Sequence, residues 1–199
     1  MSDEEIEAFK ESGKLASKIR EDSKRLIMVG ESLLDIAETI EQMIEEDGAK
    51  PAFPVNISIN DIAAHYTPEA GSEASLGETD LVKIDMGLEL NGGLSDTAYT
   101  IDLSNQNEKL VTASEDALEK AIAAIKPGMR VGEIGDVIEQ TIKGYGFKPI
   151  SNLSGHMIKS NELHAGVEIP NIKTQDPYEL KEGEIFAVEP FATTGNGYV

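Results

Sequence analysis

Two aspartates, Asp85 and Asp96, lie within the strand-like stretch LVKIDMGLELNGGLSDTAYTIDL, residues 81–103. Both have apolar neighbours, such as Ile84 and Ala98, in what should be a buried sheet. A single aspartate at a strand end more often caps backbone amides than performs chemistry. Two ionised carboxylates close together repel each other and resist burial, so they need a bound cation or a shared proton. The pair therefore favours a divalent metal site.

The chain has only three histidines, His65, His156 and His164, each in an apolar or small-residue setting. A lone histidine is more often a satisfied polar residue than a metal ligand. Two of the three, however, lie in the same part of the chain as Glu189. Spare imidazoles at a metal site could orient a substrate.

Four residues give a mixed oxygen and nitrogen ligand set: Asp85, Asp96, His156 and Glu189. Such a set suits Mn, Fe, Co or Zn, and ligand type alone does not choose among them. Two ions sharing a site could provide a nucleophile at neutral pH and a Lewis acid for a carbonyl. The residues therefore predict a metal-assisted hydrolase.

The elements that must position these residues follow from the hydrophobic pattern. Apolar spacing and stop signals predict four helices, over about residues 3–26, 31–47, 108–125 and 133–143. The stretch 81–103 predicts a hairpin that turns at Asn91-Gly92-Gly93. Extended structure is expected at 51–60, strands at 163–169 and 185–189, and a loop at 173–180.

The sequence contains an internal repeat. The tripeptide VGE occurs at 29–31 and again at 131–133, each time followed by a predicted helix, a glycine and Lys-Pro. The segment DLVKID, ending at Asp85, also parallels EIFAVE, ending at Glu189. This order predicts two copies of a helix–helix–sheet unit, of which the second is incomplete. The counterpart of Asp96 would then fall near or beyond Val199, so one carboxylate is expected to be missing.

Composition narrows the class of protein. The 199 residues include 37 acidic and 17 basic side chains, for a formal charge of -20. That charge disfavours binding to nucleic acid or to an anionic membrane. The absence of cysteine excludes disulfides and thiolate chemistry. The acidic start and the lack of a run of about 18 apolar residues predict a soluble cytoplasmic protein.

Five motifs, spread over most of the chain, carry a family resemblance: AFPVNISIN with AAHYTP (52–68), VKIDMGLELNGGLSDTAYT (82–100), NLSGHMI (152–158), LHAG (163–166) and EGEIFAVEPFATTGNG (182–197). The sequence resembles the archaeal type II methionine aminopeptidases of the pita-bread metallopeptidase family. The resemblance implies an α+β pita-bread fold with two pseudo-symmetric helix–helix–antiparallel-sheet halves. These would be residues 1–105 and 106–199 of a single catalytic domain, 1–199, with the second half incomplete.

The resemblance also implies roles for individual residues. Two divalent ions (Co, Mn, Fe or Zn) would be bound by Asp85, Asp96, His156 and Glu189. Glu189 would also handle the proton of the attacking water, while His65 and His164 would contact the substrate. A pocket for the methionine side chain would be formed by Phe53, Leu163 and Phe191, although core packing is the alternative role for the two phenylalanines. The implied reaction removes the N-terminal methionine from nascent peptides with a small second residue, near the ribosome.

The sequence departs from the family pattern at its end. The family has a fifth ligand, a glutamate in a C-terminal return strand after an inserted helical subdomain, and this sequence stops before both. We therefore expect an N-terminal portion, inactive alone, that needs a complementing C-terminal chain. Two alternatives remain, an X-Pro dipeptidase or creatinase-like metallohydrolase and a non-catalytic pita-bread binding protein. The four intact ligand positions argue against the second.

Overall fold

The computed structural model describes residues 2–199, which form two compact units. The first unit ends at Gln106, and the second extends from Asn107 to Val199. Each unit begins with two helices and continues into antiparallel strands. Among the described residues, no helix is both long and apolar enough to cross a membrane.

The first unit opens with helix α1 (Asp3–Ser23), which runs into a short 3-10 helix, η1 (Lys24–Leu26). The Ser2 and Glu5 side chains form a capping box that satisfies free backbone amides at the start of α1. Helix α2 (Leu33–Glu46) starts at a Ser32 cap and is followed by Gly48, which has a φ of 83°. Both predicted helices are confirmed.

The sheet of the first unit is built around one long strand. Strand β3 (Leu81–Leu90) pairs on one edge with β1 (Lys50–Pro51) and β2 (Asn56–Ile59), and on the other with β4 (Gly93–Asp102). All three pairings are antiparallel. Asn91 and Gly92 connect β3 to β4 with φ values of 53° and 84°, the backbone that a tight hairpin turn requires. The predicted hairpin is confirmed.

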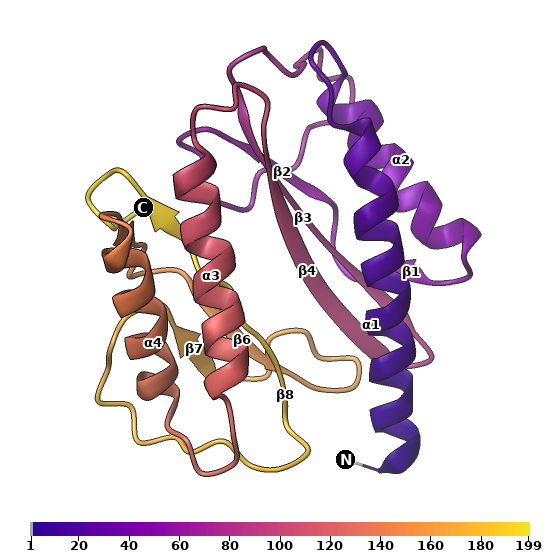
Figure 1. The fold of residues 1–199 in the computed structure, drawn as a ribbon. Helices are drawn as coiled ribbons and strands as arrows, with labels where there is room; N and C mark the ends of the chain where they lie inside the picture. Colours follow the sequence, from indigo (N-terminus) through magenta and orange to yellow (C-terminus); the bar gives the residue numbers. More distant parts are fainter. Residues whose placement is uncertain (1) are drawn as a thin grey trace. The chain divides into compact units, whose positions relative to one another are not determined.

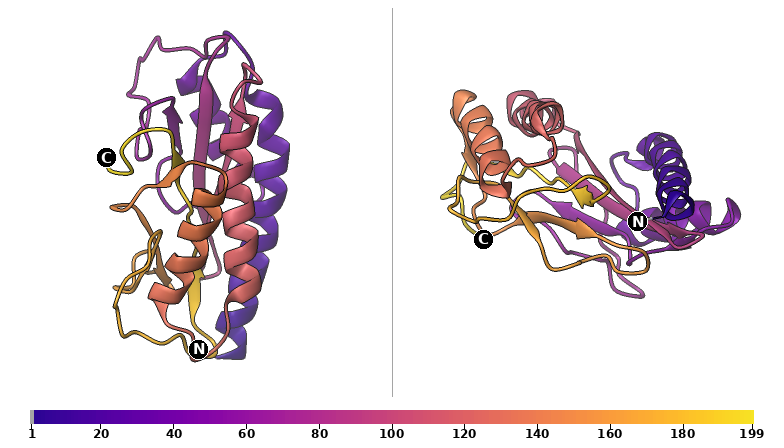
Figure 2. Two further views of the ribbon diagram at one scale, coloured as in Figure 1. Left: turned by 60° about the vertical axis from the view of Figure 1, so that its left-hand side comes forward. Right: turned by 90° about the horizontal axis from the view of Figure 1, so that it is seen from below.

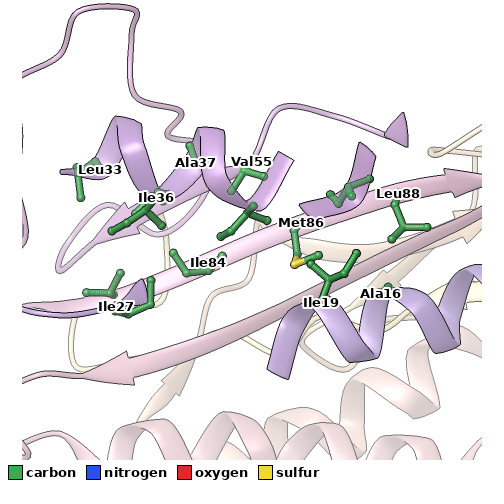
Figure 3. Close-up of a cluster of buried hydrophobic side chains, with 14 of the residues drawn as sticks. Ala16, Ile19, Ile27, Leu33, Ile36, Ala37, Val55, Ile84, Met86 and Leu88 are labelled. Carbon is green, nitrogen blue, oxygen red and sulfur yellow. The ribbon is translucent and has the colours of Figure 1, made fainter. Parts of the chain in front are cut away.

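The core of the first unit lies between this sheet and its two helices (Figure 1). Alternate residues of β3 face the helices and have no exposed surface: Val82, Ile84, Met86 and Leu88. Figure 3 shows three of them packed among side chains of α1 and α2, including Ile19 and Ile36. Because successive side chains of a strand point to opposite faces, Asp85 lies on the face away from this core. The expectation that the aspartates occupy buried apolar positions is therefore wrong.

Helices α3 (Glu108–Ala124) and α4 (Val131–Gly144) begin the second unit, as predicted. They run next to each other in both views of Figure 2. Alanines recur at every fourth position of α3, at Ala113, Ala117 and Ala121, and all three are fully buried. This spacing places the three small side chains on one face of the helix. The core also contains the isoleucines of α4 and one from a strand, Ile134, Ile138, Ile142 and Ile169.

The strands of the second unit are short. Strand β6 (Ser154–Ile158) lies between β7 (Glu168–Pro170) and β8 (Ile185–Ala187), while β5 (Lys148–Pro149) pairs with β9 (Ala192–Thr193). The internal repeat is visible here, because each Lys-Pro that follows a second helix forms a two-residue strand, β1 or β5. The predicted loop at 173–180 is confirmed, with no helix or strand in it.

Two strand assignments made from the sequence need correction. The strand expected at 163–169 starts only at Glu168, and β6 was not predicted. Gly166 has a φ of 83°, a left-handed conformation that interrupts an extended strand before β7. The backbone there still donates to β6, from Ala165 to the carbonyl of Met157 at 2.8 Å.

Glycine replacements in α4 are expected to have opposite effects on stability. A Cβ atom on Gly135 would lie 2.1 Å from the carbonyl oxygen of Ile172, a backbone atom that cannot easily move. Gly135→Ala should therefore lower the free energy of unfolding by about 1–3 kcal/mol. Gly144→Ala, in the same helix with open space at its Cβ, should leave stability unchanged or raise it by up to about 1 kcal/mol. Urea denaturation compares the two, and equal losses would contradict the packing described for α4.

Candidate active site

The first unit places Asp85 and Asp96 on one face of the β3–β4 hairpin. Asp85 lies opposite Ala98, and Gly87 lies opposite Asp96. Directly opposed residues point to the same face, so the two carboxylates are diagonal neighbours whose backbones are about 7–8 Å apart. Both side chains therefore project from the same face of the hairpin, and both are only half-buried.

Gly87 lies on the same face as the two aspartates, two residues after Asp85 and directly opposite Asp96. A Cβ atom at Gly87 would lie 2.4 Å from Cε1 of Phe53 and 2.7 Å from the carbonyl oxygen of Ser95. The absence of a side chain thus allows the Phe53 ring to pack over Gly87, on the face from which both aspartates project. Phe53 is held nearby by its neighbour Ala52, whose amide donates to the carbonyl of Gly87 at 2.9 Å. An apolar surface therefore adjoins the two acidic groups.

The loop that follows β2 carries His65, whose side chain is exposed and whose φ is 64°. This left-handed conformation is uncommon outside glycine and costs conformational energy. The loop is tied back to β2, because the amide of Ile57 donates to the carbonyl of Tyr66 at 2.7 Å. His65 thus belongs to an ordered loop of the first unit.

Two further polar residues in this unit were not predicted from the sequence. The Asn56 side-chain amide donates to Oδ2 of Asp85 at 3.3 Å, and the Thr67 hydroxyl donates to Oδ1 of Asn56 at 2.8 Å. Both lie within the quoted motifs AFPVNISIN and AAHYTP, but their contact depends on the pairing of β2 with β3.

Lys83 lies on the same face of β3 as Asp85. Burial lowers the pKa of Lys83 to about 8, although the negative charge of Asp61 acts in the opposite direction. Its ammonium group donates to the carbonyl oxygen of Asn60 at 3.1 Å. Lys83 therefore fastens the turn after β2 to the neighbouring strand.

The second unit brings His156, His164 and Glu189 together. His156, in the middle of β6, lies opposite Ala187 of β8, and Glu189 follows Ala187 by two residues, just after the strand ends. The His156 Nε2 atom is 3.3 Å from Oε1 of Glu189, and the two side chains are 10% and 30% exposed. The rings of His156 and His164 are 4.3 Å apart between their centroids.

The chemistry of the His156–Glu189 pair fits a metal ligand set. Nδ1 of His156 is 3.5 Å from the carbonyl oxygen of Met157, which can only accept a hydrogen bond. With the proton on Nδ1, the lone pair on Nε2 faces the Glu189 carboxylate. Nε2 and the carboxylate oxygen then both carry lone pairs, and they repel each other at this distance unless a proton or a cation lies between them. A backbone carbonyl that accepts from the other ring nitrogen is the usual support for a metal-binding histidine.

Two residues of the expected methionine pocket, Leu163 and Phe191, also belong to the second unit, and both are half-buried. Phe191 lies two residues after Glu189, and its carbonyl accepts from the amide of Ile150 at 2.9 Å. Gly155, which precedes His156, is required by packing, because a Cβ there would lie 2.2 Å from the carbonyl oxygen of Ala187. The close approach of β8 thus explains why a glycine precedes His156.

Residues 7–199 of this chain match the sequence model of metallopeptidase family M24. The chain belongs to family M24. Metal-dependent peptide hydrolysis is the chemistry of that family, so the predicted metallopeptidase and its need for divalent metal are confirmed.

Relatives and solved structures agree with this assignment. The chain is 51% identical to a methionine aminopeptidase of Thermococcus onnurineus and 49% identical to one of Methanocaldococcus jannaschii. Each match covers 98% of this chain and 67% of the relative. A methionine aminopeptidase structure from Thermotoga maritima matches 99% of this chain and 83% of its own, with a TM-score of 0.91 and 29% identity.

The M24 fold also occurs in peptidases with another specificity. A prolidase structure from Pyrococcus furiosus matches 95% of this chain and 56% of its own, with a TM-score of 0.83 and 30% identity. The predicted pita-bread fold is therefore confirmed. The chain spans about two thirds of the length of its M24 relatives from Thermococcus and Methanocaldococcus.

Proposed function

We propose that this M24 chain acts in the metal-dependent removal of N-terminal methionine from peptides with a small second residue. The observation that carries the proposal is the 51% identity, over 98% of the chain, to a protein named methionine aminopeptidase. The apolar Phe53 side chain beside Asp85 and Asp96 supports it. Newly made peptides in the cytoplasm are the proposed substrates.

The proposed site draws residues from both units. Asp85 and Asp96 of the first unit, with His156 and Glu189 of the second, would hold two divalent ions. When bound, the ions would activate the scissile carbonyl and the attacking water at neutral pH. The Glu189 carboxylate would accept the proton of that water, while His65 and His164 would donate hydrogen bonds to the substrate near the scissile bond.

Selectivity for methionine is assigned to an apolar pocket. Phe53, Leu163 and Phe191 would surround the substrate side chain. Full burial of a methionine side chain contributes about 1.5–3 kcal/mol, and its flexible thioether adapts to an irregular pocket. A pocket of this kind favours methionine over smaller side chains, whereas the small second residue must be selected elsewhere.

A peptide panel tests the proposal. The chain is loaded with Mn²⁺ or Co²⁺ and assayed with Met-Ala-Ser, Leu-Ala-Ser and an X-Pro dipeptide. Because the Thermococcus relative is longer, a fusion of the chain to the unmatched part of that relative is assayed in parallel. We expect the fusion to release methionine faster than leucine, because the unbranched, flexible thioether adapts to an irregular pocket better than a branched side chain of similar size. Faster hydrolysis of the X-Pro peptide would move the assignment to the prolidase branch of M24.

A further inference from the structure

A row of polar side chains in the first unit ends at Asp85. Asn56 of β2 and Asp85 of β3 are directly paired in the antiparallel sheet, so their side chains leave from the same face. The Asn56 amide contacts Oδ2 of Asp85 at 3.3 Å. Thr67, from the loop that follows β2, continues the row with its hydroxyl 2.8 Å from Oδ1 of Asn56.

The charge of Asp85 sets the direction of these hydrogen bonds. A carboxylate accepts only, so the Asn56 side chain must turn its NH₂ group toward Asp85. Its carbonyl oxygen then needs a donor, and the single hydroxyl proton of Thr67 supplies it. The carbonyl of Val55 is the other acceptor near that hydroxyl, but at the longer distance of 3.3 Å. The order Thr67 to Asn56 to Asp85 follows.

A neutral amide is well suited to this position. A lysine or arginine in place of Asn56 would also fix Asp85, but its positive charge would repel a metal ion at the same carboxylate. The amide holds one oxygen while leaving the negative charge of Asp85 available. Partners of this kind commonly orient a metal ligand, and their loss typically weakens metal binding by about 10–100-fold.

We infer that Asn56 and Thr67 are positioning residues that orient Asp85 for a divalent ion, with Thr67 acting through Asn56. This inference rests on the proposed function, because it takes Asp85 to be a metal ligand. Neither residue needs to contact the peptide or the metal.

Calorimetric titration of the purified chain with Mn²⁺ tests the inference. Asn56→Ala should weaken binding by about tenfold or more, and Thr67→Val by a smaller factor. Thr67→Ser, which keeps the hydroxyl, should bind within about twofold of the unsubstituted chain. The double variant should bind no more weakly than Asn56→Ala alone, because Thr67 orients Asp85 only through Asn56. Ser58→Ala is the control, since its hydroxyl is 3.5 Å from the amide of Tyr66 in the same loop.

The outcomes separate this inference from the proposed function. Metal binding that is unchanged in Asn56→Ala, or losses that add in the double variant, would overturn the inference and leave the proposed function intact. An equal loss in Ser58→Ala would show that only the loop matters, and would also overturn it. If the unsubstituted chain binds no Mn²⁺, the metal site proposed for this chain fails, and the inference fails with it. Thermal unfolding of each variant verifies that it is folded.

Discussion

Asp96→Asn is expected to weaken divalent-metal binding by more than about 100-fold. The amide has nearly the shape of the carboxylate but lacks its charge, so the change removes an anionic ligand without opening a cavity. Loss of a partner outside the ligand set costs about 10–100-fold in affinity, and loss of a ligand should cost more. Titration calorimetry with Mn²⁺ measures the change.

The control for Asp96 is Asp61→Asn, an exposed aspartate in the turn after β2. Its substitution removes the same formal charge from the same unit, at a position outside the β3–β4 hairpin. Metal affinity should change by less than about twofold, because exposed charges act weakly at a distance in salt. Equal losses in both variants would show that Asp96 acts only through net charge, and would contradict its role as a ligand.

Glu189→Gln should lower the rate of methionine release by about 10²–10⁴-fold, the range expected when a group that transfers a proton is lost. Glutamine keeps the size of the side chain next to His156 but cannot accept a proton from water. The measurement is the steady-state rate on Met-Ala-Ser with the metal-loaded fusion described above. Glu182→Gln, an exposed residue in the preceding turn, is the matched control and should retain full activity. Activity of Glu189→Gln within tenfold of the unsubstituted protein would contradict the assigned role.

Local signals in the sequence were sufficient for the helices and the hairpin. The Asn91-Gly92 pair predicted a tight turn because both positions need a positive φ, and both have one. The position of Asp85 was misjudged because the apolar residues of β3 were taken as a single buried run. Successive side chains of β3 in fact point to opposite faces of the sheet. Ile84 and Met86 lie in the core, and Asp85 lies on the opposite face.

Other features depend on contacts between distant parts of the chain. Strand β6 was missed because it is short and contains Gly155. Glycine weakens a strand, and here it is needed for the close approach of the Ala187 carbonyl. Asn56 and Thr67 were missed for a similar reason. Only the register of β2 against β3 places Asn56 opposite Asp85, and nothing in the local sequence fixes that register. The role of His156 was predicted from its residue type and from the family motif, and its contact with Glu189 supports the prediction.

We propose that ligands from both units bind the same metal. Electron spin echo spectroscopy of the chain with a substoichiometric amount of Mn²⁺ tests it most directly, because it detects nitrogen bound to the ion. A shared metal should give a nitrogen signal that disappears in His156→Ala. Asp96→Asn, which removes no nitrogen, should strongly reduce the signal at the same Mn²⁺ concentration. An unchanged nitrogen signal in Asp96→Asn, or a signal without nitrogen in the unsubstituted chain, would show that the two units do not share a metal.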